Sequence, residues 1–313
     1  MPDVIIMLFA LGMIAGLIQS DLKISKGTYE TIAILLMFAI GLKGGLALHG
    51  NWHPDLIVNF VAVAIVGVLI PVFLFPILRH VVALDKANSA SIAAHYGSVS
   101  AGTFAVVVAW AEGRQMILAP ETTLYLVLLE LPAIIVGILL YRAGSKESGG
   151  HLSMIHEAFT GRGVMLLIGG VIVGFLYGEE GAASITPLFI VLFPGLLAFF
   201  LLEMGLCAAR ELAAWKPGML RVAAFALITP TILAIVGIFL GFALGLPDGS
   251  ILVLATIIAS SSYIAAPAAI RQAVPEADIG LAMLASLGIT FPFNVLIGIP
   301  LYAWLMTVIA GIF

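Results

Sequence analysis

Ten apolar runs, each close to the length of a membrane-spanning helix, follow one another along this sequence. A helix needs roughly 20 mostly apolar residues to cross the hydrocarbon core of a bilayer. Only 10% of the 313 residues are charged, against about 25% in a soluble domain, so the chain lacks the polar residues that would cover a water-exposed surface. The sequence therefore predicts an all-α integral membrane protein of about ten transmembrane helices. The runs are roughly 4–20, 29–48, 55–79, 88–111, 121–142, 161–178, 184–209, 218–245, 250–270 and 278–310.

A polar stretch in the middle of the chain, 143–160, is rich in glycine and serine and is typical of a flexible linker. It leaves about five apolar runs on each side. Because five is an odd number of spans, a second copy of the same fold would enter the membrane from the opposite side. We therefore predict a first five-helix repeat at 1–142, a cytoplasmic linker at 143–160, and an inverted repeat at 161–313, the plan of many secondary transporters.

Short matches between the two halves support this prediction. They recur in the same order and at offsets near 160–164 residues, and each is weak alone because glycine and leucine are common here. The matched elements are Ile40-Gly-Leu-Lys-Gly-Gly45 with Met204-Gly-Leu-Cys-Ala-Ala209, Pro132 with Pro292, and two serine-rich segments in the fourth and ninth runs.

The basic residues divide unequally between the two sides of a ten-span topology. Eleven fall on the side of the membrane where spans 1 and 2, 3 and 4, 5 and 6, 7 and 8, and 9 and 10 are connected. Only Lys43 and Arg114 fall on the other side. Cytoplasmic loops are enriched in lysine and arginine, so the first side is cytoplasmic and both termini lie outside. The eleven are Lys23, Lys26, Arg79, Lys86, Arg142, Lys146, Arg162, Arg210, Lys216, Arg221 and Arg271.

Two polar segments interrupt the apolar runs, Gly97-Ser-Val-Ser-Ala-Gly-Thr103 and Ala259-Ser-Ser-Ser-Tyr-Ile-Ala-Ala-Pro-Ala268. Unwound backbone survives at membrane depth only beside protein or water. The new half-helix that begins after each break offers unpaired N–H groups and a partial positive charge, which bind small anions. We predict that the breaks face each other and form the substrate site. Its candidate residues are Ser98, Ser100, Ala101, Gly102, Thr103, Ser260, Ser261, Ser262 and Tyr263. The alternative is that these small residues only let helices pack closely.

A cation site is predicted beside the breaks. Glu130 lies in the middle of a span, where a carboxylate is costly and usually functional, so it could ligate sodium or carry a proton. Ser262 and Asn294 could add oxygen ligands. The structural alternatives are that Glu130 pairs with hydroxyls and the carbonyl freed by Pro132, and that Asn294 caps the kink at Pro292.

Three other polar residues, Lys43, Glu203 and His95, fall in or near apolar runs. We expect Lys43 to extend toward the membrane interface and Glu203 to pair with a basic residue. His95 and Ser98 invite a hydrolase interpretation, but they are three residues apart on one segment, whereas catalytic pairs usually come from different elements. The sequence also lacks a P-loop, so nucleotide does not drive the protein directly. We expect no enzyme activity, no cofactor and no nucleic-acid partner.

The serine motifs resemble those of the sodium-dependent bicarbonate transporter family of cyanobacteria and its wider bacterial superfamily. The matching elements are Ala259-Ser-Ser-Ser262, Val99-Ser100 with Thr103, Ile40-Gly-Leu-x-Gly-Gly45 and Met204-Gly, and the resemblance covers nearly the whole chain. Two departures occur: Tyr263 stands where the cyanobacterial pattern has an acidic residue, and Ala266-Pro267-Ala268 replaces Gly-Pro-Pro.

The resemblance implies ten spans in a core and a gate domain, in the bacterial inner membrane and often in a homotrimer. It implies bicarbonate at the crossed breaks beside sodium, with Ser100, Thr103 and Ser260 to Ser262 lining the anion site. Glu130 matches an acidic residue before proline. Cyanobacterial members are regulated by a small signalling protein of the PII type on the cytoplasmic face.

The leading prediction is sodium-coupled uptake of bicarbonate or a similar small anion by alternating access. A sodium/proton antiporter is the alternative, with Glu130 as its titrating group. A passive anion channel and an intramembrane hydrolase are less favoured, because the apolar spans lack a continuous polar stripe and the sequence places no second buried acid to orient His95.

Overall fold

The computed structural model describes residues 4–51, 53–143 and 161–311, and every regular element among them is helical. The predicted linker lies, apart from its first residue, outside the described residues. The helices are α1 (Val4–Leu17), α2 (Lys26–Leu48), α3 (Leu56–His80), α4 (Lys86–Gly97), α5 (Ala101–Glu112), α6 (Leu124–Arg142), α8 (Arg162–Ala182), α9 (Phe193–Ala213), α10 (Leu220–Ala243), α11 (Asp248–Ile258), α12 (Ala265–Ala273), α13 (Ile279–Met283), α14 (Phe291–Phe293) and α15 (Ile299–Ala310). Short turns are η1 (Pro120–Thr123), η2 (Pro187–Val191), η3 (Pro217–Met219), η4 (Leu284–Thr290) and η5 (Asn294–Gly298).

Seven helical segments in the described part of the chain are long and apolar enough to cross a membrane, judged by length and composition. They coincide with the second to sixth, eighth and tenth predicted runs. The first run holds α1, which has only 14 residues, and the seventh holds α9. The ninth is divided into α11 and α12. The structure thus confirms an all-α membrane protein, with seven rather than ten segments meeting the length and composition of a full span.

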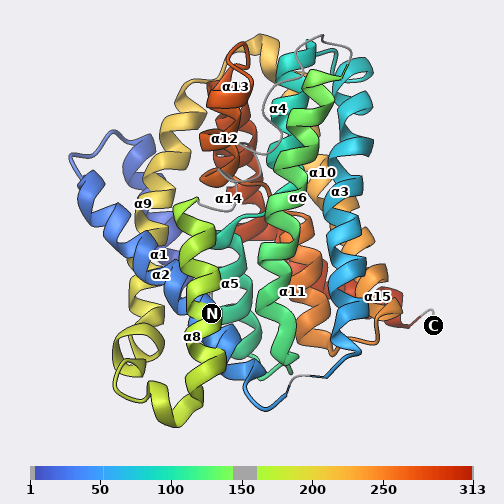
Figure 1. Cartoon of the computed structure of the whole chain (residues 1–313). Helices are drawn as coiled ribbons and strands as arrows, with labels where there is room; N and C mark the ends of the chain where they lie inside the picture. The colour runs from blue at the N-terminus through green and yellow to red at the C-terminus, as the bar shows by residue number, and fades with distance from the viewer. Residues whose placement is uncertain (1–3, 52, 144–160, 312–313) are drawn as a thin grey trace.

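The helices form two groups, visible on the left and right of Figure 1. In the first group α1 packs along α9 and α2 packs along α8; the second contains α3 to α6 and α10 to α15. Glycines make the first group tight. A Cβ atom on Gly41 or Gly45 of α2 would collide with a backbone carbonyl oxygen of α8, at Leu167 or Val171. Close backbone approach at small residues is how membrane helices pack without a hydrophobic driving force between them.

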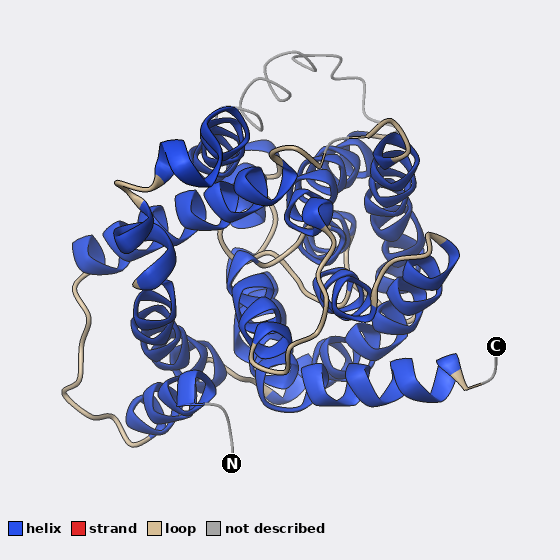
Figure 2. Ribbon diagram, turned by 90° about the horizontal axis from the view of Figure 1, so that it is seen from below, coloured by secondary structure: helices blue, strands red, loops and turns tan. Residues whose placement is uncertain are grey.

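The last apolar segment, Ile279–Ala310, is continuous in sequence but bent in space. Wider, π-type turns at η4 and η5 flank the short α14, which contains Pro292. Proline and such turns are common causes of helix kinks. In Figure 2 most helices are seen end-on, whereas the helix leading to the C-terminus lies across the view. The bend puts η4 against α9 and α15 against α11.

Both predicted helix breaks are present. α4 ends at Gly97 and α5 begins at Ala101, and α11 ends at Ile258 and α12 begins at Ala265. The two broken segments run past each other: α5 packs against α11, and α4 packs against α12. The breaks therefore lie at the same level, inside the second group of helices. This crossing positions the candidate site.

Candidate functional site

Two reciprocal hydrogen bonds join the breaks. The backbone amide of Ser100 donates to Oγ of Ser260 at 2.9 Å. In the other direction, the amide of Ser262 donates to the carbonyl oxygen of His95 at 2.7 Å. All four residues are buried, so each bond also satisfies a polar group that would be costly to leave unpaired at this depth. Each unwound segment is therefore stabilised by the other.

A serine side chain caps the half-helix that follows each break. Oγ of Ser100 accepts a hydrogen bond from the amide of Thr103 at 3.0 Å, at the start of α5. Oγ of Ser262 accepts from the amide of Ala266 at 3.1 Å, at the start of α12. The remaining first-turn amides of a helix have no acceptor within it, so two half-helices present their positive ends at the crossing.

Several hydroxyl groups at the breaks are buried but unpartnered. Ser98 Oγ, Thr103 Oγ1 and Ser261 Oγ have no hydrogen-bond partner among the residues that the structure describes. Each of these side chains is at most 6% exposed. Because buried polar groups are almost always paired with protein, water or an ion, such a concentration marks a place where a polar ligand or ion is expected.

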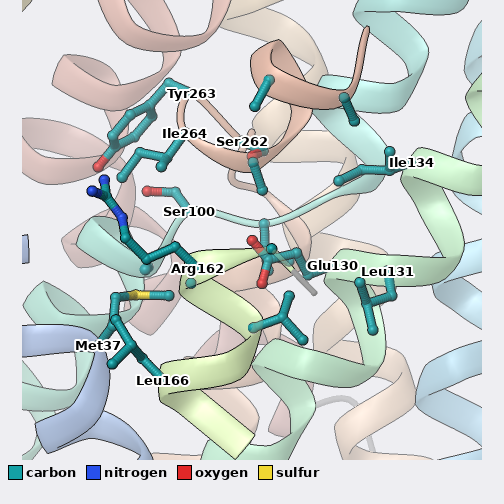
Figure 3. Close-up of a pocket in the computed structure, with 18 of the residues that line it drawn as sticks. Met37, Ser100, Glu130, Leu131, Ile134, Arg162, Leu166, Ser262, Tyr263 and Ile264 are labelled. Atoms are coloured by element: carbon teal, nitrogen blue, oxygen red, sulfur yellow. The ribbon is translucent and has the colours of Figure 1, made fainter. Parts of the chain in front are cut away.

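A cavity of about 390 Å³ opens beside the crossing. Both breaks contribute to its wall, through Ser100 and Ser262, and so do α6 through Glu130 and α8 through Arg162. Figure 3 shows these side chains together, with the Arg162 guanidinium on the side of Ser100 and Tyr263. The cavity lies between the two groups of helices, because α2 and α8 belong to one group and the breaks and α6 to the other.

The structure gathers the nine predicted anion-site residues around the crossing, but they differ in access to the cavity. Those that line it are Ser100, Ala101, Ser262 and Tyr263. The Tyr263 hydroxyl lies against Gly102, where it leaves no room for a Cβ atom. Ser98, Thr103, Ser260 and Ser261 are buried at the crossing and do not line this cavity.

The sequence of the whole chain was compared with protein families and with curated proteins. The family model described as the Na⁺-dependent bicarbonate transporter superfamily matches residues 4–307. The chain belongs to this superfamily. No curated protein matched. The resemblance inferred from the serine motifs is thereby confirmed, and the two breaks that carry those motifs are the parts of the structure where unpaired polar groups gather.

Glu130, one of three predicted cation ligands, fits a role in a sodium-dependent protein. Its side chain is only 6% exposed, and no described residue donates a hydrogen bond to its Oε2 atom. Among the described residues, no hydroxyl group forms a hydrogen bond with this Oε2 atom, as the structural alternative would require. Glu130 lines the cavity together with Ser262. A buried carboxylate without a partner is costly, which favours a cation or a proton as its missing partner.

Asn294, another predicted cation ligand, is fully buried and does not line the cavity. Its Nδ2 atom donates to the carbonyl oxygen of Ala259 at 3.1 Å, and its Oδ1 atom accepts from the Tyr302 hydroxyl at 2.6 Å. Both polar ends of the amide are therefore used. Asn294 therefore holds the backbone at the start of the second break, a role that neither the predicted cation ligand nor the predicted cap of the Pro292 kink described.

Three other predicted residues have clear positions. Lys43 forms a 2.8 Å ion pair with Glu112 of α5 and lies over the Phe193 ring; its extension to the membrane interface stays a prediction. Glu203 pairs with Arg210 at 2.8 Å, as expected. The Nδ1 atom of His95 forms a hydrogen bond with the carbonyl oxygen of Ser91, one turn earlier in α4. Neither His95 Nε2 nor Ser98 Oγ has a hydrogen-bond partner among the described residues. The histidine–serine pair of a hydrolase is therefore not formed.

Arg162 was used in the sequence only to orient the chain, but it lines the cavity. It is the first residue of α8 and is exposed. A signal was available, because an arginine directly before an apolar run starts at the edge of a span. The pattern of apolar residues could not show that the start of α8 faces the two breaks, because that position depends on how α8 packs against α2.

Proposed function

We propose that this protein is a secondary active transporter that couples sodium entry to uptake of bicarbonate or a similar small anion by alternating access. The observation that carries the proposal is the crossing of the two breaks. Two half-helix starts, three buried hydroxyl groups without a partner among the described residues, and a cavity lie together at this crossing. Discontinuous helices with exposed half-helix ends are the usual construction of substrate and ion sites in secondary transporters.

We propose that the chain forms ten spans in two inverted five-helix repeats. The packing pattern supports this. The first helix of the first half, α1, packs on the second helix of the second half, α9. In the same way α2, the second helix of the first half, packs on α8, the first helix of the second half. Similarly, α3 packs on α4 as α10 packs on α11. Together with the basic-residue split, this favours a cytoplasmic linker and external termini. An inner-membrane location and a homotrimer are proposed from the family resemblance alone.

In the proposed binding mode the anion lies at the start of α5 and α12. Backbone amides at Ala101 and Gly102 and hydroxyls of Ser100, Ser261 and Ser262 contribute hydrogen bonds. Anions bind helix N-termini because unpaired amides and the helix dipole both favour negative charge.

Sodium is proposed to bind nearby, to hydroxyl and carbonyl oxygens of the breaks, with Glu130 supplying negative charge. Unwound carbonyls are usual sodium ligands in such transporters. Glu130 and Ser262 reach the shared cavity. Asn294 supports the site indirectly, through its bond to the Ala259 carbonyl.

In the alternating-access cycle, the cavity between the two helix groups opens to one side of the membrane at a time. The anion and sodium lie on one group, at the breaks, whereas α2 and α8 form the opposite wall. A relative movement of the groups would expose the same site to the other side. Binding both solutes together lowers the electrostatic cost of moving either charge through the membrane.

A sodium/proton antiporter remains the second candidate, favoured by one observation. Glu130 is a buried carboxylate beside the cavity with no ion pair in the described part of the chain, whereas Glu203 is paired with Arg210. Such a group is suited to exchange a proton for sodium. The serine-capped half-helix starts, which suit an anion, favour the symporter.

The decisive experiment measures labelled bicarbonate uptake into proteoliposomes that contain the purified protein. An inward sodium gradient should drive accumulation, and replacing sodium by potassium should abolish it. Protein-free liposomes and a collapsed gradient are the controls. Sodium-driven proton efflux without bicarbonate uptake would identify the antiporter instead. Uptake that follows only the bicarbonate gradient and ignores sodium would identify a passive channel.

A further inference from the structure

The cavity beside the breaks is larger and more apolar than a bicarbonate ion requires. Its volume of about 390 Å³ falls within the range of about 300–1,000 Å³ that is usual for pockets holding small organic molecules. Much of its wall is aliphatic, from Leu131, Ile134, Ile135 and Ile138 of α6 and Leu166 of α8. An inorganic anion gains nothing from such walls, because apolar surroundings disfavour a charge.

Arg162, Ser100 and Tyr263 lie together at one end of the cavity, and Glu130 and Ser262 lie between them and the aliphatic side chains of α6 (Figure 3). Figure 3 shows the Arg162 guanidinium directed toward Ser100 and Tyr263, while Leu131 and Ile134 lie on the opposite side, beyond Glu130. Arg162 forms no ion pair with any carboxylate in the described ranges. A guanidinium presents a planar fork of donors that fits a carboxylate through two parallel hydrogen bonds.

Tyr263 provides a second, independent donor at this end. Its side chain is 6% exposed, and its hydroxyl interacts with the Ser100 side chain and with the backbone of Gly102. The hydroxyl lies against Gly102, in the first turn of α5, where amides lack intrahelical acceptors. A guanidinium, a phenol and a helix start thus converge on one volume, with an apolar compartment next to it.

We propose that the transported anion is a monocarboxylate with a short apolar tail. Its carboxylate would bind between Arg162 and Tyr263 at the start of α5, and its tail would lie along Ile134, Ile135 and Ile138. Bicarbonate fills only the polar end. This inference rests on the proposed function, because it uses the same site. It adds the class of substrate and two elements that would set specificity: Arg162, which binds the carboxylate, and the isoleucines of α6, which contact the tail.

The charges of the cavity balance under this proposal. Glu130 and the bound carboxylate are both negative, and two negative groups in one poorly hydrated cavity repel strongly. Arg162 offsets one of them and the coupling sodium ion offsets the other. The arrangement therefore requires sodium for tight carboxylate binding, which is the thermodynamic basis of coupling.

The test measures carboxylate affinities for the purified protein in nanodiscs, from the ligand dependence of its unfolding temperature in sodium buffer. Acetate, propionate, butyrate and pentanoate form the series. Each added methylene should tighten binding about fourfold, because it removes apolar surface from water. Pentanol has the same tail without the charge and should bind far more weakly. Decanoate tests a lipid-derived fatty acid, and its affinity should not exceed that of pentanoate if the compartment is short.

Two pairs of variants separate the head from the tail. Arg162→Gln should weaken every carboxylate by about ten- to a hundredfold and leave the pentanoate-to-acetate ratio unchanged, whereas Arg221→Gln, outside the cavity, is the matched control. Ile135→Thr should lower the pentanoate-to-acetate ratio several-fold, and Ile135→Val should preserve it. The ratio is internal to each variant, so partial loss of folded protein does not affect it.

The possible outcomes distinguish this inference from the proposed function. Equal affinities along the series, or pentanol binding as tightly as pentanoate, would overturn the substrate class even if sodium drives bicarbonate uptake. Affinity that keeps rising to decanoate without dependence on Arg162 would show partition into the lipid and would also overturn it. A chain-length series that depends on Arg162, without bicarbonate uptake, would support the inference and refute bicarbonate transport.

Discussion

The backbone amide of Ser100 donates a hydrogen bond to the hydroxyl oxygen of Ser260, 160 residues further along the chain. Ser260 in turn donates to the carbonyl of Ile257, one turn back in α11. This separation of 160 residues equals the spacing between Pro132 and Pro292, one of the matches between the two halves of the sequence. The side chain of Ser260 therefore connects the backbone of the first break to the end of α11 at the second.

Ser260 and Ser261 are adjacent but are expected to respond differently to alanine substitution. Ser260→Ala removes the acceptor of the Ser100 amide and leaves a buried donor unpaired, which should cost about 1–3 kcal/mol of stability. Ser261 Oγ has no partner among the described residues, so Ser261→Ala should leave the unfolding temperature nearly unchanged. It should instead raise the Km for the anion about ten- to a hundredfold, because a hydroxyl on a charged ligand is lost.

Thermal unfolding and uptake kinetics on both variants check this contrast. Ser100→Ala should show both effects, because Oγ of Ser100 caps α5 and lines the cavity. The double variant of Ser100 and Ser261 should be nearly inactive. Wild-type Km in Ser261→Ala at normal expression would move the anion away from the second break.

The sequence predicted the elements of this site better than their contacts. The length of the apolar runs predicted where the helices lie. Glycine, serine and proline predicted both breaks, because these residues destabilise a helix locally. Asn294 was left undecided, since its two hydrogen bonds join residues on different elements. Arg162 and the Lys43–Glu112 pair were missed because they depend on packing between the helix groups. The first apolar run was predicted to reach residue 20, whereas α1 ends at Leu17, so an apolar run can continue beyond the end of the helix.

Glu130→Gln should weaken sodium dependence without destabilising the protein. Glutamine keeps the shape and a carbonyl oxygen but removes the charge, and the Oε2 atom has no described hydrogen-bond partner that would be lost. The sodium concentration for half-maximal uptake should rise at least about tenfold, as expected for one lost charge contact. Glu179→Gln, on an exposed residue of α8, is the control. Unchanged sodium affinity would assign Glu130 to structure.

The proposed topology predicts that the loops on the two sides of α2 lie on opposite sides of the membrane. In a Cys207→Ala background, Asp21→Cys lies in the loop before α2 and His53→Cys in the loop after it; both positions are exposed. A membrane-impermeant maleimide added outside should label His53→Cys in intact cells and Asp21→Cys only after permeabilisation. Labelling of both from outside would be incompatible with an inverted repeat.

The Lys43–Glu112 ion pair is expected to bias the transport cycle, because it links the two groups of helices. Lys43 belongs to α2 and Glu112 ends α5, and their side chains are 26% and 47% exposed. A partly exposed pair contributes about 0.2–1 kcal/mol, enough to shift a two-state equilibrium by up to about fivefold. If the groups separate there when the site opens outward, Lys43→Gln and Glu112→Gln should each increase outward opening by up to that factor.

The measurement is the labelling rate of a cysteine at Ala101, which lines the cavity, in the Cys207→Ala background with impermeant maleimide outside. The double variant Lys43→Gln/Glu112→Gln should label no faster than either single variant, because both remove the same interaction. Exchanging the charges, Lys43→Glu with Glu112→Lys, should restore the slower rate. Additive effects of the two single variants would show that the residues act separately and that the pair does not report on movement of the helix groups.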